Sequence, residues 1–211
     1  MNHSLFVLGG ATGGLGKQVV RIACAAGVGR AWCDLNSQES VTNWCESVAT
    51  LDGEIHILNL AGKMTSAMLH KASRLESQLM LDTNVGGNAL MLGRLRTVFK
   101  SHPGSTYTMV GSVTAQLGVV GTGLYSATKS ALEGLTRVAA REFAPFARVN
   151  LLHLGYCDAG MIAAVPNHEA LIESIPMKRL GTAEDVAEAW KFFINCKYVT
   201  GAIVNVNGGL V

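Results

Sequence analysis

Short apolar segments alternate with amphipathic helical segments along the whole chain, and this alternation restricts the fold more than any other feature. Residues 4–9, 30–34, 54–60, 105–111, 147–153 and 199–206 are predicted to be strands. Helices are predicted at 14–26, 37–51, 66–100 (with a break near 81–83), 123–143, and from Thr182 onward. Strands that are connected through helices pair in parallel within one sheet. We therefore predict one α/β domain over residues 1–211, a doubly wound Rossmann-like fold with a mostly parallel sheet of about six strands.

The composition is typical of a globular protein without nucleic-acid or membrane partners. Of the 211 residues, 49% are hydrophobic and 15% charged, and the formal net charge is +2. There is no basic stripe for a nucleic acid, and the apolar runs are too short to span a membrane. The five cysteines are odd in number and never at CxxC spacing, which favours reduced thiols and a cytoplasmic location. No histidine has a second ligand at metal spacing, so no metal site is predicted.

A glycine-rich segment, Gly9-Gly10-Ala11-Thr12-Gly13-Gly14-Leu15-Gly16, lies between the first predicted strand and the first predicted helix. Glycines at such a turn let backbone N–H groups approach a pyrophosphate, and the helix N-terminus adds partial positive charge. The alternative is a flexible turn that binds no ligand. The position directly after the N-terminal strand favours a dinucleotide site that includes Gly10, Thr12, Gly14, Leu15 and Gly16.

Asp34 follows Gly14 by 20 residues and ends the second predicted strand. A carboxylate at that position accepts hydrogen bonds from the adenosine ribose and repels a 2′-phosphate. This favours NAD as the coenzyme, with NADP not excluded. The competing interpretation is that Asp34 is a turn or capping residue ahead of the next helix.

Tyr125 and Lys129 stand four residues apart in a predicted helix, so their side chains lie on one face, one turn from each other. The ammonium group favours a phenolate, and a tyrosine with a lowered pKa exchanges a proton with a carbonyl oxygen near neutral pH. The spacing alone is common on solvated helices. Its weight as a catalytic signal depends on the residues upstream.

Those residues make the chain resemble the short-chain dehydrogenase/reductase family nearly from end to end. The glycine segment is similar to the family motif TGxxxGxG, with Gly9 in place of the threonine, and Asn59-Leu60-Ala61-Gly62 is similar to NNAG. Asn84 matches the active-site asparagine. Ser112 matches the catalytic serine, 13 residues before Tyr125. The overall pattern is most similar to 3-oxoacyl-acyl-carrier-protein reductases.

The resemblance implies an NAD(P)-dependent oxidoreductase that interconverts a ketone and a secondary alcohol. In that scheme Ser112 binds the substrate carbonyl, Tyr125 donates the proton, Lys129 favours the phenolate and holds the nicotinamide ribose, and Asn84 anchors a water molecule. The substrate is then a small carbonyl or alcohol compound, with an acyl-linked one as an option, and the protein a homo-oligomer, either tetramer or dimer. Further implied coenzyme contacts are Asp34, Leu35, Asn59, Ala61, Gly62, Gly155 and Cys157.

The chain departs from the family pattern on its adenosine side. Only 49 residues separate Gly10 from Asn59, which leaves room for one strand and one helix where the family fits two of each. In one alignment Asp34 ends the second strand. In the other, Cys33-Asp34-Leu35-Asn36 corresponds to the family's third strand and its aspartate contacts adenine, while the surviving strand still lies beside the first. This shortening supports a second hypothesis, a non-catalytic or cofactor-sensing subunit.

A second departure lies after the strand predicted at 147–153. Leu154 replaces the proline of a family Pro-Gly pair, and Ala159 replaces a threonine that helps to hold the coenzyme. One lost hydroxyl contact costs on the order of 1 kcal/mol. Residues 156–180 are expected to form the substrate lid.

Overall fold

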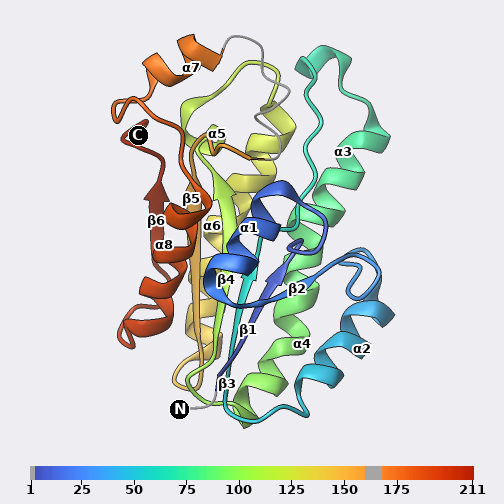
Figure 1. The fold of residues 1–211 in the computed structure, drawn as a ribbon. Coiled ribbons are helices and arrows are strands. Elements are labelled where there is room, and N and C mark those ends of the chain that lie inside the picture. The colour runs from blue at the N-terminus through green and yellow to red at the C-terminus, as the bar shows by residue number, and fades with distance from the viewer. Residues whose placement is uncertain (1–2, 160–167) are drawn as a thin grey trace.

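The computed structural model describes residues 3–159 and 168–211, and it contains one six-stranded sheet. Every neighbouring pair of strands is parallel, in the order β2-β1-β3-β4-β5-β6 (Figure 1). The predicted Rossmann-like fold and strand number are confirmed. The strands are β1 (His3–Leu8), β2 (Ala26–Val28), β3 (Glu54–Asn59), β4 (Thr106–Ser112), β5 (Arg148–Leu154) and β6 (Ile203–Val206).

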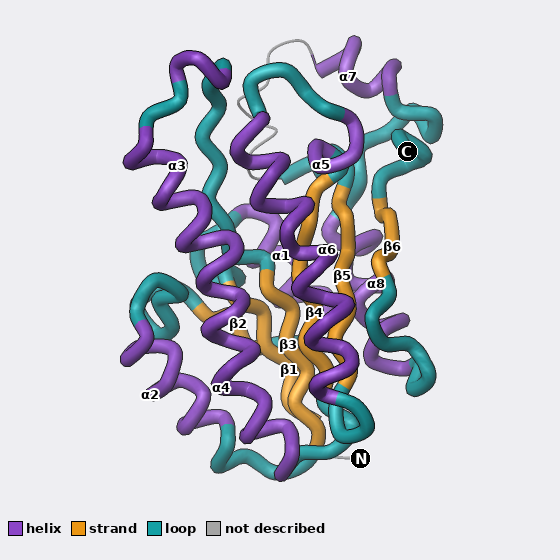
Figure 2. Tube along the Cα trace, turned by 180° about the vertical axis from the view of Figure 1, so that it is seen from behind, coloured by secondary structure: helices purple, strands orange, loops and turns teal. Residues whose placement is uncertain are grey.

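Helices cover both faces of the sheet. Figure 1 shows α1 and α8 in front of the strands, and Figure 2 shows α2, α4 and α6 covering the other face. Two apolar cores fill the layers on either side. The helices are α1 (Gly14–Ala23), α2 (Gln38–Val48), α3 (Arg74–Leu81), α4 (Gly87–Ser101), α5 (Thr114–Leu117), α6 (Gly123–Phe143), α7 (His168–Ser174) and α8 (Ala183–Asn195).

Several helix starts follow from local side-chain chemistry. The Ser37 side chain accepts a hydrogen bond from the Ser40 N–H at the start of α2. At the start of α8, Thr182 and Asp185 form a capping box, in which each side chain satisfies a backbone N–H of the other residue. The prediction that Thr182 opens a helix is therefore confirmed, and α6 has the predicted bounds.

The strand predicted at 30–34 is wrong. β2 is formed earlier, by Ala26–Val28, which pair with Phe6–Leu8 of β1. After it the chain turns, because the Gly29 carbonyl accepts the N–H groups of both Trp32 and Cys33. Ala, Gly and Val at β2 give a weak strand signal, and pairing with β1 overrides it. The expectation that the surviving strand lies beside the first is confirmed.

The region predicted as one long helix at 66–100 contains four elements. A 3₁₀ turn at Leu69–Lys71 precedes α3, and a π-helical turn at Asp82–Gly86 joins α3 to α4. The predicted break near 81–83 is therefore a change of helical pitch. The helices α5 and α7 were not predicted. Among the described helices, none combines the length and apolarity that a membrane span requires.

Candidate active site

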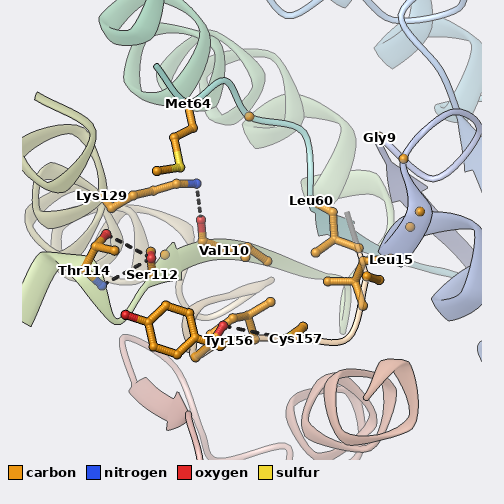
Figure 3. A pocket seen from close by; sticks show the side chains of 18 of the residues that line it. Gly9, Leu15, Leu60, Met64, Val110, Ser112, Thr114, Lys129, Tyr156 and Cys157 are labelled. Atoms are coloured by element: carbon orange, nitrogen blue, oxygen red, sulfur yellow. Dashed lines mark hydrogen bonds between the residues drawn. The ribbon is translucent and has the colours of Figure 1, made fainter. Parts of the chain in front are cut away.

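A cavity of about 310 Å³ opens at the carboxyl ends of the strands, where ligands bind in sheets of this type. Figure 3 shows the glycine segment at one end of the cavity, and Ser112 on β4 and Lys129 on α6 at the other. Tyr125, one turn before Lys129 on α6, also lines the cavity. Leu60 and Met64 line the space between these ends. The fold therefore brings together segments that lie more than 100 residues apart in the chain.

The glycine segment packs tightly against its surroundings. Gly9 has a φ of +79°, a conformation that favours glycine, and a Cβ on Gly16 would lie 2.7 Å from the Gly9 carbonyl oxygen. The first backbone hydrogen bond of α1 runs from the Lys17 N–H to the Gly13 carbonyl, so the N–H groups of Gly14, Leu15 and Gly16 precede it. These three residues line the cavity. They present free helix N-terminal donors to a phosphate.

Gly10 and Thr12, which were predicted in the same site, do not line the cavity. A Cβ on Gly10 would lie 2.7 Å from the Val20 side chain and 2.8 Å from the Val7 carbonyl oxygen. Gly10 is therefore needed to let α1 pack on β1.

Tyr125 and Lys129 are each 5% exposed and lie on one face of α6 as predicted. The Lys129 Nζ donates a hydrogen bond to the Val110 carbonyl oxygen at 2.7 Å and lies 5.6 Å from the centre of the Tyr125 ring. Burial lowers the pKa of Lys129 from 10.5 to about 8. The expected lowering of the pKa of Tyr125 is wrong for this structure, because burial raises it and the hydrogen bond with Ser112 only opposes that rise.

Ser112 ends β4, and its hydroxyl oxygen accepts two hydrogen bonds from Thr114. The Thr114 N–H lies 3.2 Å from the Ser112 Oγ and the Thr114 Oγ1 lies 3.0 Å from it (Figure 3). With both acceptor positions filled, the Ser112 proton is available to a partner in the cavity. Thr114 was not predicted as a site residue, although the sequence places a second hydroxyl two positions after Ser112.

Asn84 lies outside the cavity lining, buried in the π-helical turn. Its Oδ1 accepts the Lys63 N–H at 2.8 Å, and its Nδ2 donates to the Lys63 carbonyl at 2.8 Å and to the Thr128 Oγ1 at 3.0 Å. A Cβ on Gly62 would lie 3.3 Å from the Asn84 Oδ1 and 3.4 Å from the Lys129 Nζ. Asn84 thus fixes the Lys63 backbone. Gly62, which has no Cβ, leaves room for the Asn84 and Lys129 side chains.

Asp34 lies six residues beyond β2 and does not line the cavity. Its carboxylate accepts the Asn36 N–H at 3.0 Å and pairs with the Arg30 Nε at 2.9 Å. Burial is the largest single effect on the pKa of this carboxyl group and raises it. The Asn36 hydrogen bond and the Arg30 pairing together outweigh burial, so the pKa is lowered. The turn interpretation describes this geometry, since Ser37 caps the next helix, and the strand-end argument that favoured NAD over NADP no longer holds.

Three other predicted coenzyme contacts do not line the cavity: Leu35 and Asn59 are buried, and Ala61 packs against the apolar core. Leu35 packs beneath α4, where a Cβ on Gly87 would lie 2.7 Å from the Leu35 Cβ. The Asn59 amide donates to the Tyr107 hydroxyl and to Asn88, and its Oδ1 accepts the Ala61 N–H at 3.0 Å. Asn59 therefore fixes the loop after β3 from its buried side.

Gly155, Cys157 and Ala159 line the cavity beside Ser112 and the glycine segment. Burial and the nearby Asp185 raise the pKa of the Cys157 thiol to about 11, so it is protonated at neutral pH. A Cβ on Gly155 would lie 2.7 Å from the Asn207 Cα, which explains the glycine. Residues 160–167 of the expected lid lie outside the described part of the chain.

Comparison with known proteins assigns this arrangement to a family. Residues 7–211 match a family profile described as enoyl-(acyl carrier protein) reductase. The chain is 34% identical over 180 residues to carbonyl reductase family member 4 of Danio rerio, covering 84% of this chain and 75% of that protein. It is 35% identical over 181 residues to the 3-oxoacyl-[acyl-carrier-protein] reductase of Bos taurus, covering 84% and 76%.

A solved structure of a small-chain dehydrogenase in complex with NADPH shares the fold, with a TM-score of 0.86, 23% identity and 99% of each chain covered. The likeness to that structure concerns the fold, whereas the family follows from the sequence matches. The chain belongs to the short-chain dehydrogenase/reductase family of oxidoreductases.

Proposed function

We propose that this oxidoreductase uses NAD(P) to interconvert a small carbonyl compound and the corresponding alcohol, with Tyr125 as the proton donor and acceptor. The observation that carries the proposal is the shared cavity. Helix N-terminal N–H groups at one end suit a pyrophosphate, and the half-buried Ser112 with the buried Tyr125 and Lys129 at the other end suit a carbonyl oxygen. The dinucleotide supplies the hydride when it is bound.

In the reducing direction, the Ser112 hydroxyl donates a hydrogen bond to the substrate oxygen and holds it against Tyr125. Thr114 fills the acceptor positions of Ser112 and so orients that donor. Tyr125 transfers its proton to the oxygen as negative charge develops there. The Lys129 ammonium, 5.6 Å from the Tyr125 ring, stabilises the phenolate that remains. The hydrogen bond to the Val110 carbonyl holds the Lys129 ammonium, and Gly62 leaves room for it.

The substrate class is proposed from the relatives and from the cavity. Two relatives are named for carbonyl reduction and for 3-oxoacyl-carrier-protein reduction, which supports a ketone on an aliphatic or acyl chain. Apolar side chains such as Leu60, Met64 and Leu154 border the cavity and suit such a chain. A cytoplasmic location and a homo-oligomer, tetramer or dimer, complete the proposal.

Titration of the purified protein with NADH and with NADPH, followed by nucleotide fluorescence, tests coenzyme binding. Both nucleotides are needed because the Arg30–Asp34 ion pair removes the argument for NAD alone. Turnover of a panel of ketones and acyl-linked 3-oxo compounds then tests the chemistry, with Tyr125→Phe as the inactive control. If neither nucleotide binds, the oxidoreductase proposal is wrong.

One structural observation supports a second candidate. Beyond β1 the sheet has a single short strand, β2, so the part of the sheet that would hold the adenosine is small. A cofactor-sensing subunit would bind the nucleotide and turn over no substrate, and Tyr125→Phe would change nothing.

A further inference from the structure

His153 is fully buried on β5 and lies beside the backbone of Ser112. Its Nδ1 lies 3.0 Å from the Ser112 N and 3.1 Å from the Ser112 O, and its Nε2 lies 3.2 Å from the Glu133 Oε1. An imidazole that carries its proton on Nε2 satisfies the Ser112 N–H and the Glu133 carboxylate together, because it accepts at Nδ1 and donates at Nε2. In that tautomer Nδ1 makes no hydrogen bond with the Ser112 carbonyl oxygen. The Glu133 carboxylate accepts that Nε2 proton and so selects this tautomer.

Gly111 makes room for the imidazole. Gly111 is the register partner of His153 in the β4–β5 ladder, and a Cβ on it would lie 2.3 Å from the His153 Nδ1. The ring therefore lies across Gly111 and reaches the next residue of β4. The contact between His153 and the Ser112 backbone therefore requires a glycine at position 111 and the Glu133 carboxylate.

The contact occupies a backbone position that the sheet leaves open. β3 ends at Asn59, opposite Met109, so β4 continues beyond it without a strand partner on that side. Val110 and Ser112 fall in that extension. The Lys129 Nζ donates to the Val110 carbonyl, and His153 accepts the Ser112 N–H. Side chains thus complete the ladder where the strand no longer does.

Both side-chain links lead to the same face of α6. Tyr125, Lys129 and Glu133 are spaced four residues apart, so they form one row along the helix. Lys129 holds Val110, and Glu133 holds Ser112 through His153. The other Glu133 oxygen pairs with Arg137 at 3.0 Å, which fixes the carboxylate.

We propose that His153 and Glu133 are positioning residues for the proposed proton transfer, which set the separation between the Ser112 hydroxyl and Tyr125. The inference rests on the proposed function for its consequence but on the described contacts for its geometry. Losing the His153 acceptor releases the end of β4. The Ser112 hydroxyl is then held less well against the Tyr125 oxygen in the free protein, and less well against the substrate oxygen during turnover. Since the hydrogen bond between Ser112 and Tyr125 opposes the rise in the pKa of Tyr125, its loss moves the pKa further upward.

Two substitutions at His153 separate the two contacts. His153→Asn places an amide oxygen near the position of Nδ1 and keeps an acceptor for the Ser112 N–H. His153→Gln places its amide near Nε2, keeps the contact with Glu133 and loses the acceptor. Glu133→Gln lets the imidazole adopt either tautomer. Glu142→Gln makes the same change in an exposed residue of α6 and serves as the control.

The measurements are kcat, KM, the coenzyme dissociation constant, the melting temperature and the titration of Tyr125. The last uses ¹³C-tyrosine NMR, with the signal assigned by its loss in Tyr125→Phe. We expect His153→Gln to lower kcat about tenfold, the size of one lost hydrogen bond, with coenzyme affinity unchanged. The Tyr125 midpoint should move upward by up to about one pH unit. In His153→Asn, kcat and the Tyr125 midpoint should both lie close to their wild-type values. Glu133→Gln should give values between those of the wild-type protein and His153→Gln.

Equal losses in His153→Asn and His153→Gln, or an unmoved Tyr125 midpoint in both, would overturn the inference. A lower melting temperature of the His153 and Glu133 variants, with kcat unchanged in the folded fraction, would also overturn it. Gly111, His153 and Glu133 would then have a purely structural role. If the wild-type protein binds coenzyme but turns over no substrate, the proposed function fails separately. The NMR titration still decides the inference in that case.

Discussion

The buried Lys129 is predicted to lower the free energy of unfolding at neutral pH. Comparison with the Lys129→Met variant measures this destabilisation. The ammonium is 5% exposed, and burial lowers its pKa from 10.5 to about 8. Between these two pH values the unfolded chain binds a proton that the folded chain has released. Stability therefore rises with pH across that window. The Met variant has no such group, so the difference between the two stability curves isolates Lys129.

The size of the effect follows from the two pKa values. The full penalty, present well below pH 8, is about 3 kcal/mol at 1.36 kcal/mol per pH unit. Evaluated by linkage, it shrinks by about 2 kcal/mol between pH 7 and pH 9.5. We expect the wild-type protein to gain about that much unfolding free energy relative to Lys129→Met over this range. The variant also loses the hydrogen bond to Val110, which sets a constant offset between the curves.

Urea denaturation followed by far-ultraviolet circular dichroism at pH 7, 8, 9 and 9.5 measures the difference. Staying below pH 10 avoids ionisation of Tyr125, whose pKa is raised. The matched control is Lys71→Met, the same change in an exposed residue. Turnover by Lys129→Met should fall at least 10²-fold, since the phenolate loses its cation.

Two results would refute this reasoning. A wild-type-minus-variant difference that stays constant from pH 7 to pH 9.5 would mean that the ammonium is solvated in the folded protein. A difference that changes in the opposite direction would mean that the folded state binds the proton more tightly, as it would with a carboxylate partner. Either result would remove the desolvated lysine from the proposed mechanism.

Three further substitutions have defined outcomes. Ser112→Ala should lower kcat roughly 10²-fold with coenzyme affinity unchanged, as steady-state kinetics and nucleotide fluorescence would measure; a proportional loss of nucleotide binding would contradict it. Gly111→Ala forces a Cβ to within 2.3 Å of the His153 ring and should lower the unfolding free energy by about 1–3 kcal/mol, measured by urea denaturation. Arg148→Ala removes the donor to three carbonyls at the end of α8 and should cost about 2–3 kcal/mol, and unchanged denaturation would show that water replaces it.

The sequence by itself determined the fold class, the family and most of the residues that form the proposed catalytic end of the cavity. Alternating periodicity specifies parallel strands joined by helices, and the carboxyl ends of such strands share one edge. Tyr125 and Lys129 lie on one helix, so their spacing alone fixes their relative positions. Ser112 could be placed because it directly follows a strong strand signal.

Tertiary structure decided what depends on contacts between distant segments. The location of β2 follows from pairing with β1, because Ala26–Val28 carry little strand propensity of their own. Asp34 became a turn residue once that strand ended six residues earlier.

The trio of Gly111, His153 and Glu133 could not be found from spacing. Its members lie on β4, β5 and α6, and their contact depends on the strand register and on the position of the helix above the sheet. Local sequence specifies which face a side chain occupies within one element. The distance between two elements is set by the packing of the whole core, and that distance is what creates this contact.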